Sequence, residues 1–177
     1  MKVKVFRYEV IDSTNEECFR KFNQKQLPPF GIVARTQTQG RGQFDRTWYS
    51  DDPQNLYISF GFVPRQSLQE FQNFSIVVAK KIVAHLQSTF DIELEVKHPN
   101  DIYACGRKMG GVLTESRVVN DIITFAVTGI GLNVAGDLSK FPRELQSQAI
   151  TLSDVCQTKI SLQTVETQVI TIMESLL

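Results

Sequence analysis

Neither sign of charge is in excess in this chain of 177 residues, which has 19 Lys and Arg against 19 Asp and Glu. A protein that binds nucleic acid over a broad surface normally has a basic excess, so this balance argues against a general nucleic-acid-binding protein. Any polyanion that the chain binds must meet a local cluster of cations. We therefore expect no nucleic-acid partner.

Cysteine is scarce and long apolar runs are missing. Cys18, Cys105 and Cys156 form no CxxC pair and have no pair of histidines near them, which argues against a disulfide framework and a zinc site. No segment approaches the roughly 18 apolar residues of a membrane-spanning helix, and the N-terminal apolar run is too short for a signal peptide. These absences predict a cytoplasmic protein with reduced thiols and no membrane partner.

What remains is an ordinary globular composition, 42% hydrophobic, and a length that suits one compact domain. Period-two alternation and β-branched runs predict strands, whereas helical spacing of apolar residues and capping boxes predict helices. We expect strands over 3–10, 31–36, 55–63, 93–96, 111–119 and 121–134, and helices over 12–25, 67–90 and 161–177. Because strands pair both as hairpins and across helices, the fold class is α+β, a mixed sheet with helices packed mainly on one face.

A polar, glycine-bearing loop over 36–48 is the first candidate for chemistry. Gly40 and Gly42 flank Arg41, and successive N–H groups in such a loop can form a concavity that binds anions. The Arg41 guanidinium matches a carboxylate or phosphate in a bidentate way. Trp48, the single tryptophan, can stack on a flat ring. A solvated hairpin loop with Trp48 in the core also fits these residues.

The second candidate is the segment 97–111. Lys97, Arg107 and Lys108 gather positive charge around a turn, and Gly110-Gly111 allow a backbone to approach a ligand closely. It is not a Walker A loop, because no Gly-Lys-Ser/Thr follows at the required spacing. A basic surface hairpin explains the same residues.

Two further segments are weaker by themselves. Gly129-x-Gly131-x-Asn133 follows an expected strand but lacks the third glycine of a dinucleotide fingerprint, although Asn133 can offer an amide to a phosphate or a metal. Ser13-Thr14-Asn15 opens the first helix, and capping alone explains these residues. Capping and ligand contact are compatible, because a helix N-terminus presents N–H groups to a bound polar group.

Taken together and in order, these segments resemble the biotin–protein ligase family, also called biotin–[acetyl-CoA-carboxylase] ligase. The resemblance rests on Asp12-Ser13-Thr14-Asn15, Gln37 with Gly40-Arg41-Gly42 and Arg46-x-Trp48, Lys97-x-Pro99-Asn100-Asp101, Arg107-Lys108-x-x-Gly111-x-Leu113-x-Glu115, Gly129-x-Gly131-x-Asn133 and Ala149-Ile150-Thr151-Leu152. It implies a class II synthetase-like biotin–lipoate ligase catalytic domain over 1–177. The N-terminal DNA-binding and C-terminal β-barrel domains of the family are expected to be absent.

The resemblance implies a two-step ligase that uses biotin, ATP and Mg²⁺. The biotin carboxylate attacks the α-phosphate of ATP to give biotinyl-5′-AMP, and a lysine of a biotin carboxyl carrier protein then attacks this anhydride. Lys108 and Arg41 are the implied catalytic residues. The implied biotin-binding residues are Ser13, Thr14, Asn15, Gln37, Arg41, Gly42, Gln43, Lys108, Gly110 and Gly111. The implied ATP-binding residues are Trp48, Lys97, Asn100 and Asn133, with Mg²⁺ arriving on ATP near Asn133. A homodimer is compatible with the resemblance.

The sequence departs from the family pattern at three positions of these segments. Gln43 stands where the family has an arginine, Asp45 where a glycine is common, and His98 where a tryptophan is usual. Asp45 brings negative charge near an anion site, which is expected to weaken retention of the adenylate. Two alternatives stay open: a lipoate or octanoate transferase of the same fold, and a biotin-binding module without turnover. The pairing of Ser-Thr-Asn with Gly-Arg-Gly favours biotin.

Overall fold

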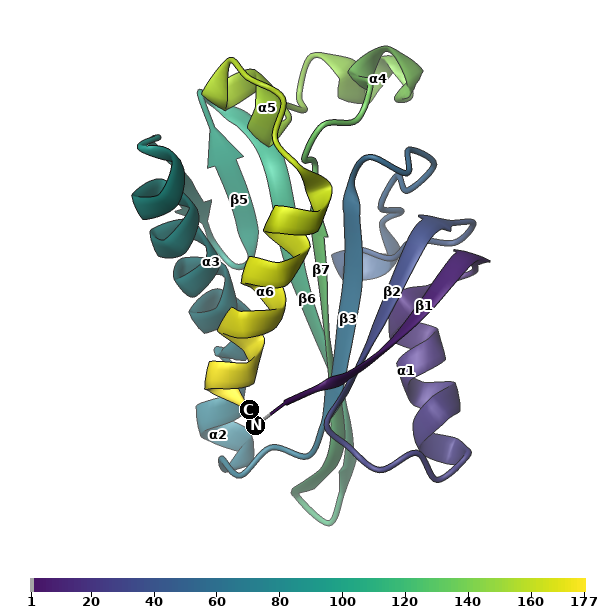
Figure 1. The fold of residues 1–177 in the computed structure, drawn as a ribbon. Coiled ribbons are helices and arrows are strands. Elements are labelled where there is room, and N and C mark those ends of the chain that lie inside the picture. The colour runs from purple at the N-terminus through teal and green to yellow at the C-terminus, as the bar shows by residue number, and fades with distance from the viewer. Residues whose placement is uncertain (1) are drawn as a thin grey trace.

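The computed structural model describes residues 2–177, with the side chain of Asp45 left out. These residues form one seven-stranded sheet in the order β1-β2-β3-β7-β6-β5-β4 (Figure 1). β1 pairs with β2 in parallel and every other neighbouring pair is antiparallel, which confirms the predicted mixed sheet. The strands are β1 (Lys4–Ile11), β2 (Phe30–Gln37), β3 (Leu56–Phe62), β4 (Glu95–Lys97), β5 (Asp101–Ala104), β6 (Arg107–Val119) and β7 (Ile122–Leu132).

Helices cover both faces of the sheet, unequally. The α-helices are α1 (Thr14–Asn23), α2 (Leu68–Phe71), α3 (Phe74–Phe90), α4 (Arg143–Gln146), α5 (Leu152–Cys156) and α6 (Leu162–Leu176), and Gln43–Asp45 and Leu138–Lys140 are short 3₁₀ turns. α3 and α6 lie on one face and α1 lies on the other (Figure 1). The expected one-sided arrangement therefore describes the longer helices, and α1 is the exception.

Two hydrophobic cores follow from the alternation of side chains along the strands. On the face of α3 and α6, a large core contains Ile58 and Phe60 of β3 with Val78 and Ile82 of α3. On the face of α1, a smaller core contains Cys18, Phe30, Ile32, Phe125 and Val127. In β3, successive residues point to opposite faces of the sheet. The odd-numbered positions of that strand are thus left to face α1.

Most predicted elements are present, and the local signals acted as expected. Ser13 is the N-cap of α1 and accepts a hydrogen bond from Glu16 N, so Thr14 is the first helical residue rather than a second cap. Ser67 and Glu70 form a capping box at the start of the helix expected over 67–90. The expected strands 111–119 and 121–134 are joined at Asn120 and Asp121. Both residues have positive φ, at 50° and 59°, as a tight hairpin turn between twisted strands requires.

Two elements differ from the sequence prediction. The helix expected over 67–90 is interrupted at Gln72 and Asn73, which separate α2 from α3. The segment Asp101–Ala104 forms β5, although the sequence predicts no strand there, and it is too short to show a period. In the part of the chain that the structure describes, none of the helices is long and apolar enough to cross a membrane.

The three thiols should differ in reactivity. Cys105 is exposed in the turn between β5 and β6, Cys156 is partly buried, and Cys18 is wholly buried in the small core. Burial raises the pKa of the Cys156 thiol and raises that of Cys18 well above its ordinary value, which lowers the thiolate fraction. A maleimide at mildly alkaline pH should label Cys105 first, Cys156 more slowly and Cys18 only in denaturant. Peptide mass mapping checks the order, and labelling of Cys18 in the native protein would contradict it.

Candidate functional site

A cavity of about 610 Å³ opens at the end of the sheet where β2 and β7 finish and β6 begins. Segments from residue 13 to residue 149 line it, so the fold gathers parts of the chain that lie far apart in sequence. The predicted site residues that line it are Ser13, Thr14, Asn15, Gln37, Arg41, Gly42, Gln43, Trp48, Asn100, Lys108, Gly111 and Asn133. Lys97 and Gly110 are the predicted residues that do not.

A buried hydrogen-bond network made by Thr14, Asn15, Gln37 and Ser59 forms one end of this cavity, and we call it the polar floor. Gln37 Oε1 accepts from Thr14 N at 2.7 Å and from Thr14 Oγ1 at 3.0 Å. Ser59 Oγ lies 2.6 Å from both Thr14 Oγ1 and Asn15 Oδ1. All four residues are buried. Because each of these side chains is the hydrogen-bond partner of another, a restraint on one of them acts on its neighbours.

Gln37 keeps a donor for a ligand. Its Nε2 carries two N–H groups, and one of them donates to Ser50 Oγ at 2.9 Å. No partner for the second is found among the described residues. Ser13 is buried beside the floor, and its Oγ accepts from the backbone of α1, which leaves its O–H group to donate. The floor can therefore donate hydrogen bonds to a polar head group.

Asn15 is placed by a glycine and by a charged partner. A Cβ atom on Gly129 of β7 would lie 2.2 Å from Asn15 Oδ1, so the amide occupies the space that any other residue at 129 would fill. Asn15 Nδ2 donates to Glu115 Oε2 at 2.6 Å. The glycine pattern at 129–131 thus serves close side-chain packing rather than a dinucleotide turn.

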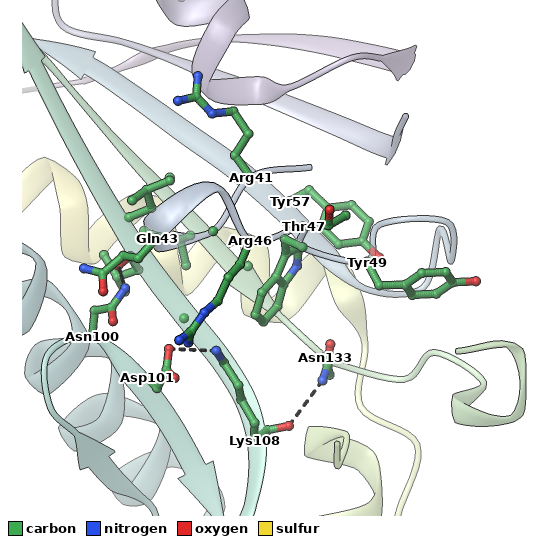
Figure 2. Close-up of a pocket in the computed structure, with 18 of the residues that line it drawn as sticks. Arg41, Gln43, Arg46, Thr47, Tyr49, Tyr57, Asn100, Asp101, Lys108 and Asn133 are labelled. Atoms are coloured by element: carbon green, nitrogen blue, oxygen red, sulfur yellow. Dashed lines mark hydrogen bonds and ion pairs between the residues drawn. The ribbon is translucent and has the colours of Figure 1, made fainter. Parts of the chain in front are cut away.

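The other end of the cavity is charged. Lys108 Nζ lies 2.8 Å from Asp101 Oδ1 and 5.3 Å from the centre of the Trp48 ring. Figure 2 shows Arg46 extending toward the same two residues, Asp101 and Lys108. Two cations and one carboxylate therefore meet where a polyanionic ligand could replace the Asp101 contact.

The Trp48 indole packs against β6 and β7, the strands that border the cavity. A Cβ atom on Gly131 would lie 2.6 Å from Trp48 Cε2 and Nε1, and one on Gly111 would lie 3.6 Å from Trp48 Cζ3. Trp48 Nε1 is buried and has no hydrogen-bond partner within the described chain. The indole thus offers a flat ring to the site, whereas its buried Nε1–H group lies against Gly131. Residues 40–48 form a small hairpin, the glycine hairpin, in which Trp48 N donates to Gly40 O at 2.9 Å.

Arg41 lines the cavity, but its guanidinium is turned away from the charged end. Nη2 donates to Glu115 Oε1 at 2.8 Å and Nη1 donates to Glu16 Oε1. Figure 2 shows this side chain pointing away from Lys108. The resemblance implies that Arg41 lies along the carboxylate and phosphate of the ligands, and that role stays a prediction. In this structure Arg46, on the opposite arm of the glycine hairpin, is the arginine that extends toward Asp101 and Lys108.

Lys97 and Gly110 do not line the cavity and instead contact other residues of the sheet. Lys97 Nζ lies 3.4 Å from Glu95 and 4.1 Å from the centre of the Tyr103 ring, outside the cavity. A Cβ atom on Gly110 would lie 2.8 Å from the backbone oxygen of Gly131 and against the Leu132 side chain, so packing within the sheet favours glycine there. His98 does line the cavity. The side chain of Asp45 lies outside the described part, so the expected effect of its charge stays a prediction.

Asn100 and Asn133 are buried at the rim, with their amides committed to the backbone. Asn100 Nδ2 donates to Val112 O at 2.5 Å, and Asn133 Nδ2 lies 3.4 Å from Lys108 O and 3.3 Å from Ile150 O. The oxygen of each amide is not engaged by these contacts.

Within residues 2–177, no group of three or more His, Cys, Asp or Glu side chains could hold a metal ion.

Sequence reasoning missed several residues that line or support the cavity. Ser59 lies inside an apolar strand pattern that gives no sign of a function. Tyr49 and Phe141 pack with ring centres 4.5 Å apart and extend the aromatic wall. Tyr57 also lines the cavity, and burial raises the pKa of its phenol, whose O–H donates to Asp52 O at 3.0 Å. An aromatic pair formed across 92 residues has no local signature.

Comparison with known proteins shows the family to which the chain belongs. The model of the biotin/lipoate A/B protein ligase family matches residues 8–133 of the chain. The chain belongs to this family. Among its relatives, the bifunctional ligase/repressor BirA of Bacillus spizizenii is 32% identical over 152 residues, which are 86% of this chain and 47% of that protein. The biotin–[acetyl-CoA-carboxylase] ligase of Mycobacterium tuberculosis is 30% identical over 128 residues, 70% of this chain and 45% of the relative.

Solved structures agree with this membership. The biotin protein ligase of Aquifex aeolicus in complex with biotin and ATP superposes with a TM-score of 0.79 at 27% identity, over 97% of this chain and 69% of that one. A bipartite lipoate protein ligase of Thermoplasma acidophilum shares the fold, with a TM-score of 0.64 at 11% identity over 99% of this chain and 83% of that one. The α+β prediction and the predicted family are confirmed. The chain spans about half the length of the curated relatives, and the expected domain boundaries stay a prediction.

Proposed function

We propose that this chain activates biotin with ATP as biotinyl-5′-AMP and transfers the biotinyl group to a lysine of a biotin carboxyl carrier protein domain. One observation carries the proposal: a floor of hydrogen-bonding side chains and a pair of cations line the same cavity. A molecule with a polar head, a short apolar body and a carboxylate matches this order of groups. The family relatives named as biotin ligases support the choice of substrate.

The polar floor is the proposed site of the biotin ureido head. A ureido ring offers one carbonyl acceptor and two N–H donors, and Gln37 and Ser13 have donors to spare. The dithiolane of lipoate offers no such groups and would leave the buried donors unpaired. A site built to hydrogen-bond its substrate rejects an analogue without those groups by about 10⁴-fold or more. The unused donors of Gln37 and Ser13 therefore favour biotin over lipoate or octanoate.

In the first step, a biotin carboxylate oxygen attacks the α-phosphorus of ATP, and the bond to pyrophosphate breaks. Both reactants are anions, so cations placed between them lower the barrier. We assign this role to Lys108, with Arg46 beside it, and Asp101 exchanges its contact with Lys108 for the incoming ligand. Mg²⁺ is expected to enter on the ATP phosphates, whose oxygens it prefers, and to neutralise them further. The amide oxygens of Asn100 and Asn133, which have no partner in the contacts above, are of the type that Mg²⁺ takes as ligands.

In the second step, the amine of the carrier lysine attacks the carbonyl carbon of the adenylate, AMP leaves, and the amine loses a proton. Water in the site would hydrolyse the adenylate before the carrier lysine reacts with it. The cavity must therefore be covered until the carrier domain binds. The glycine hairpin is the proposed cover. The Trp48 indole, with the Tyr49–Phe141 pair beyond it, is the proposed wall for adenine.

The proposal is tested by incubating the chain with ATP, Mg²⁺, a carrier domain, and either biotin or lipoate. Mass spectrometry should detect one added biotinyl group on the carrier, and pyrophosphate release should depend on biotin. Transfer of lipoate instead would overturn the substrate assignment. Biotin binding without pyrophosphate release would indicate a binding module and overturn the enzymatic proposal. The cytoplasmic location and the homodimer stay predictions.

A further inference from the structure

Glu115 joins two parts of the site that the proposed reaction uses separately. It lies in β6, and its side chain is 23% exposed. One carboxylate oxygen accepts from Asn15 Nδ2 at 2.6 Å, and the other accepts from Arg41 Nη2 at 2.8 Å. Asn15 belongs to the polar floor and Arg41 belongs to the glycine hairpin. A single carboxylate therefore contacts both the head-group site and its proposed cover.

The same floor reaches the hairpin by a second route. Gln37 Nε2 donates to Ser50 Oγ, and Ser50 Oγ donates to Trp48 O at 2.9 Å. Trp48 in turn donates its backbone N–H to Gly40 O, which closes the base of the hairpin. Hydrogen bonds thus run from Arg41 through the floor and return to Trp48. The two ends of the hairpin are fixed by opposite ends of one network.

Arg41 supplies the charged side-chain attachment of the hairpin to the rest of the molecule. Its guanidinium bridges Glu16 of α1 and Glu115 of β6. Among the other hairpin side chains that the structure describes, Gln43, Arg46 and Thr47 form no hydrogen bond with the body. Charge-assisted hydrogen bonds are about twice as strong as neutral ones. Trp48 holds its arm of the hairpin by packing against Gly131 and Gly111, and the opposite arm depends on whether Arg41 stays on its two carboxylates.

We infer that Glu115 is a positioning residue that couples occupation of the polar floor to the placement of the glycine hairpin. A ligand held by the floor restrains Asn15, which restrains Glu115 and through it Arg41. By reciprocity, fixing the hairpin must strengthen binding in the floor by the same factor. The identity of the ligand rests on the proposed function, whereas the link between floor and hairpin rests on the contacts alone.

The test compares Glu115→Gln, Arg41→Gln and the double variant with the natural chain. Glutamine keeps an oxygen that can accept from Asn15 and loses the charge that holds Arg41. Hydrogen–deuterium exchange of residues 40–48 without ligand should be about five- to tenfold faster in each single variant. The double variant should exchange no faster than Arg41→Gln. The Arg41–Glu115 contact is already lost in that single variant, so Glu115→Gln has no further contact with Arg41 to break. Glu9→Gln, which weakens the surface pair of Glu9 and Arg35 at 3.6 Å, is the matched control and should not alter this exchange.

The second measurement adds saturating biotin. In the natural chain biotin should slow exchange of the hairpin about tenfold, and in Glu115→Gln less than about twofold although biotin still binds. A purely structural role for Glu115 would lower the melting temperature and leave this protection in place, which would overturn the inference. Additive effects of Glu115→Gln and Arg41→Gln without ligand would overturn it too. If biotin does not bind at all, the proposed function fails, and the unliganded comparison still decides the inference.

Discussion

Replacing Lys108 with methionine is expected to lower the rate of biotinyl-adenylate formation by about 10²- to 10³-fold, the usual effect of removing one preorganised charge-stabilising group. Methionine keeps the stem of the side chain beside Trp48 and removes the ammonium group that lies 2.8 Å from Asp101. Biotin-dependent exchange of pyrophosphate into ATP measures this step. A rate within tenfold of the natural chain would contradict the assignment of Lys108.

Two controls separate the loss of a cation from its side effects. Lys108→Met leaves Asp101 without its partner, and that carboxylate then repels ATP. Adding Asp101→Asn removes the repulsion, so the double variant should stay slow if Lys108 acts on the reaction itself. Lys97→Met should reduce the rate less than about threefold, because Lys97 contacts only Glu95 and the Tyr103 ring, in a half-exposed position, and does not line the cavity. A loss comparable to that of Lys108 would restore the role that the sequence suggested for Lys97.

Replacing Gly131 with alanine should displace Trp48 and weaken ATP binding roughly tenfold, the scale of an overpacked contact. The new Cβ would lie 2.6 Å from the indole. The backbone at this position cannot yield, since Gly131 pairs with Tyr57 of β3 on one side and with Gly111 of β6 on the other. The indole must therefore move. As Trp48 is the only tryptophan, its fluorescence emission reports the displacement, and nucleotide titration gives the affinity.

Gly31→Ala is the matched control for this substitution. Gly31 also lies in the sheet, but a Cβ there would be 3.4 Å from Val5 Cγ2 and 3.5 Å from Phe60, which is close to ordinary contact. Emission and ATP affinity should both stay at their natural values. If Gly131→Ala also keeps both, Trp48 does not form the wall of the nucleotide site.

The parts of the fold that local chemistry determines could be predicted from the sequence. Capping at Ser13 and Ser67, the turn at Asn120-Asp121 and the alternation over 3–10 each depend on neighbours within a few residues. β5 has no such signal, because Asp101–Ala104 is held by pairing with β4 and β6 rather than by its own pattern. The break between α2 and α3 likewise lies inside a continuous helical spacing of apolar residues.

For the site, the sequence indicated the segments more reliably than the side chains. A cluster of basic residues does not specify which of them faces a cavity, and strand register turns Lys108 inward and Lys97 toward Glu95 and Tyr103. The same holds for Arg41 and Arg46, which stand on opposite arms of one hairpin. Ser59 was missed because a hydroxyl in an apolar strand acquires its partners only when α1 packs against β3.

The unequal size of the two hydrophobic cores determines which part of the protein unfolds first and so how ligand binding is lost. α1 carries Thr14 and Asn15, yet the core beneath it is the small one, built around Cys18, Phe30 and Phe125. Regions with little buried apolar contact open at lower free energy than the molecule as a whole. Detachment of this helix dismantles ligand recognition while the opposite side of the sheet stays intact. Loss of function under mild stress is then a subglobal event, and reinforcing α3 or α6 gives no protection against it.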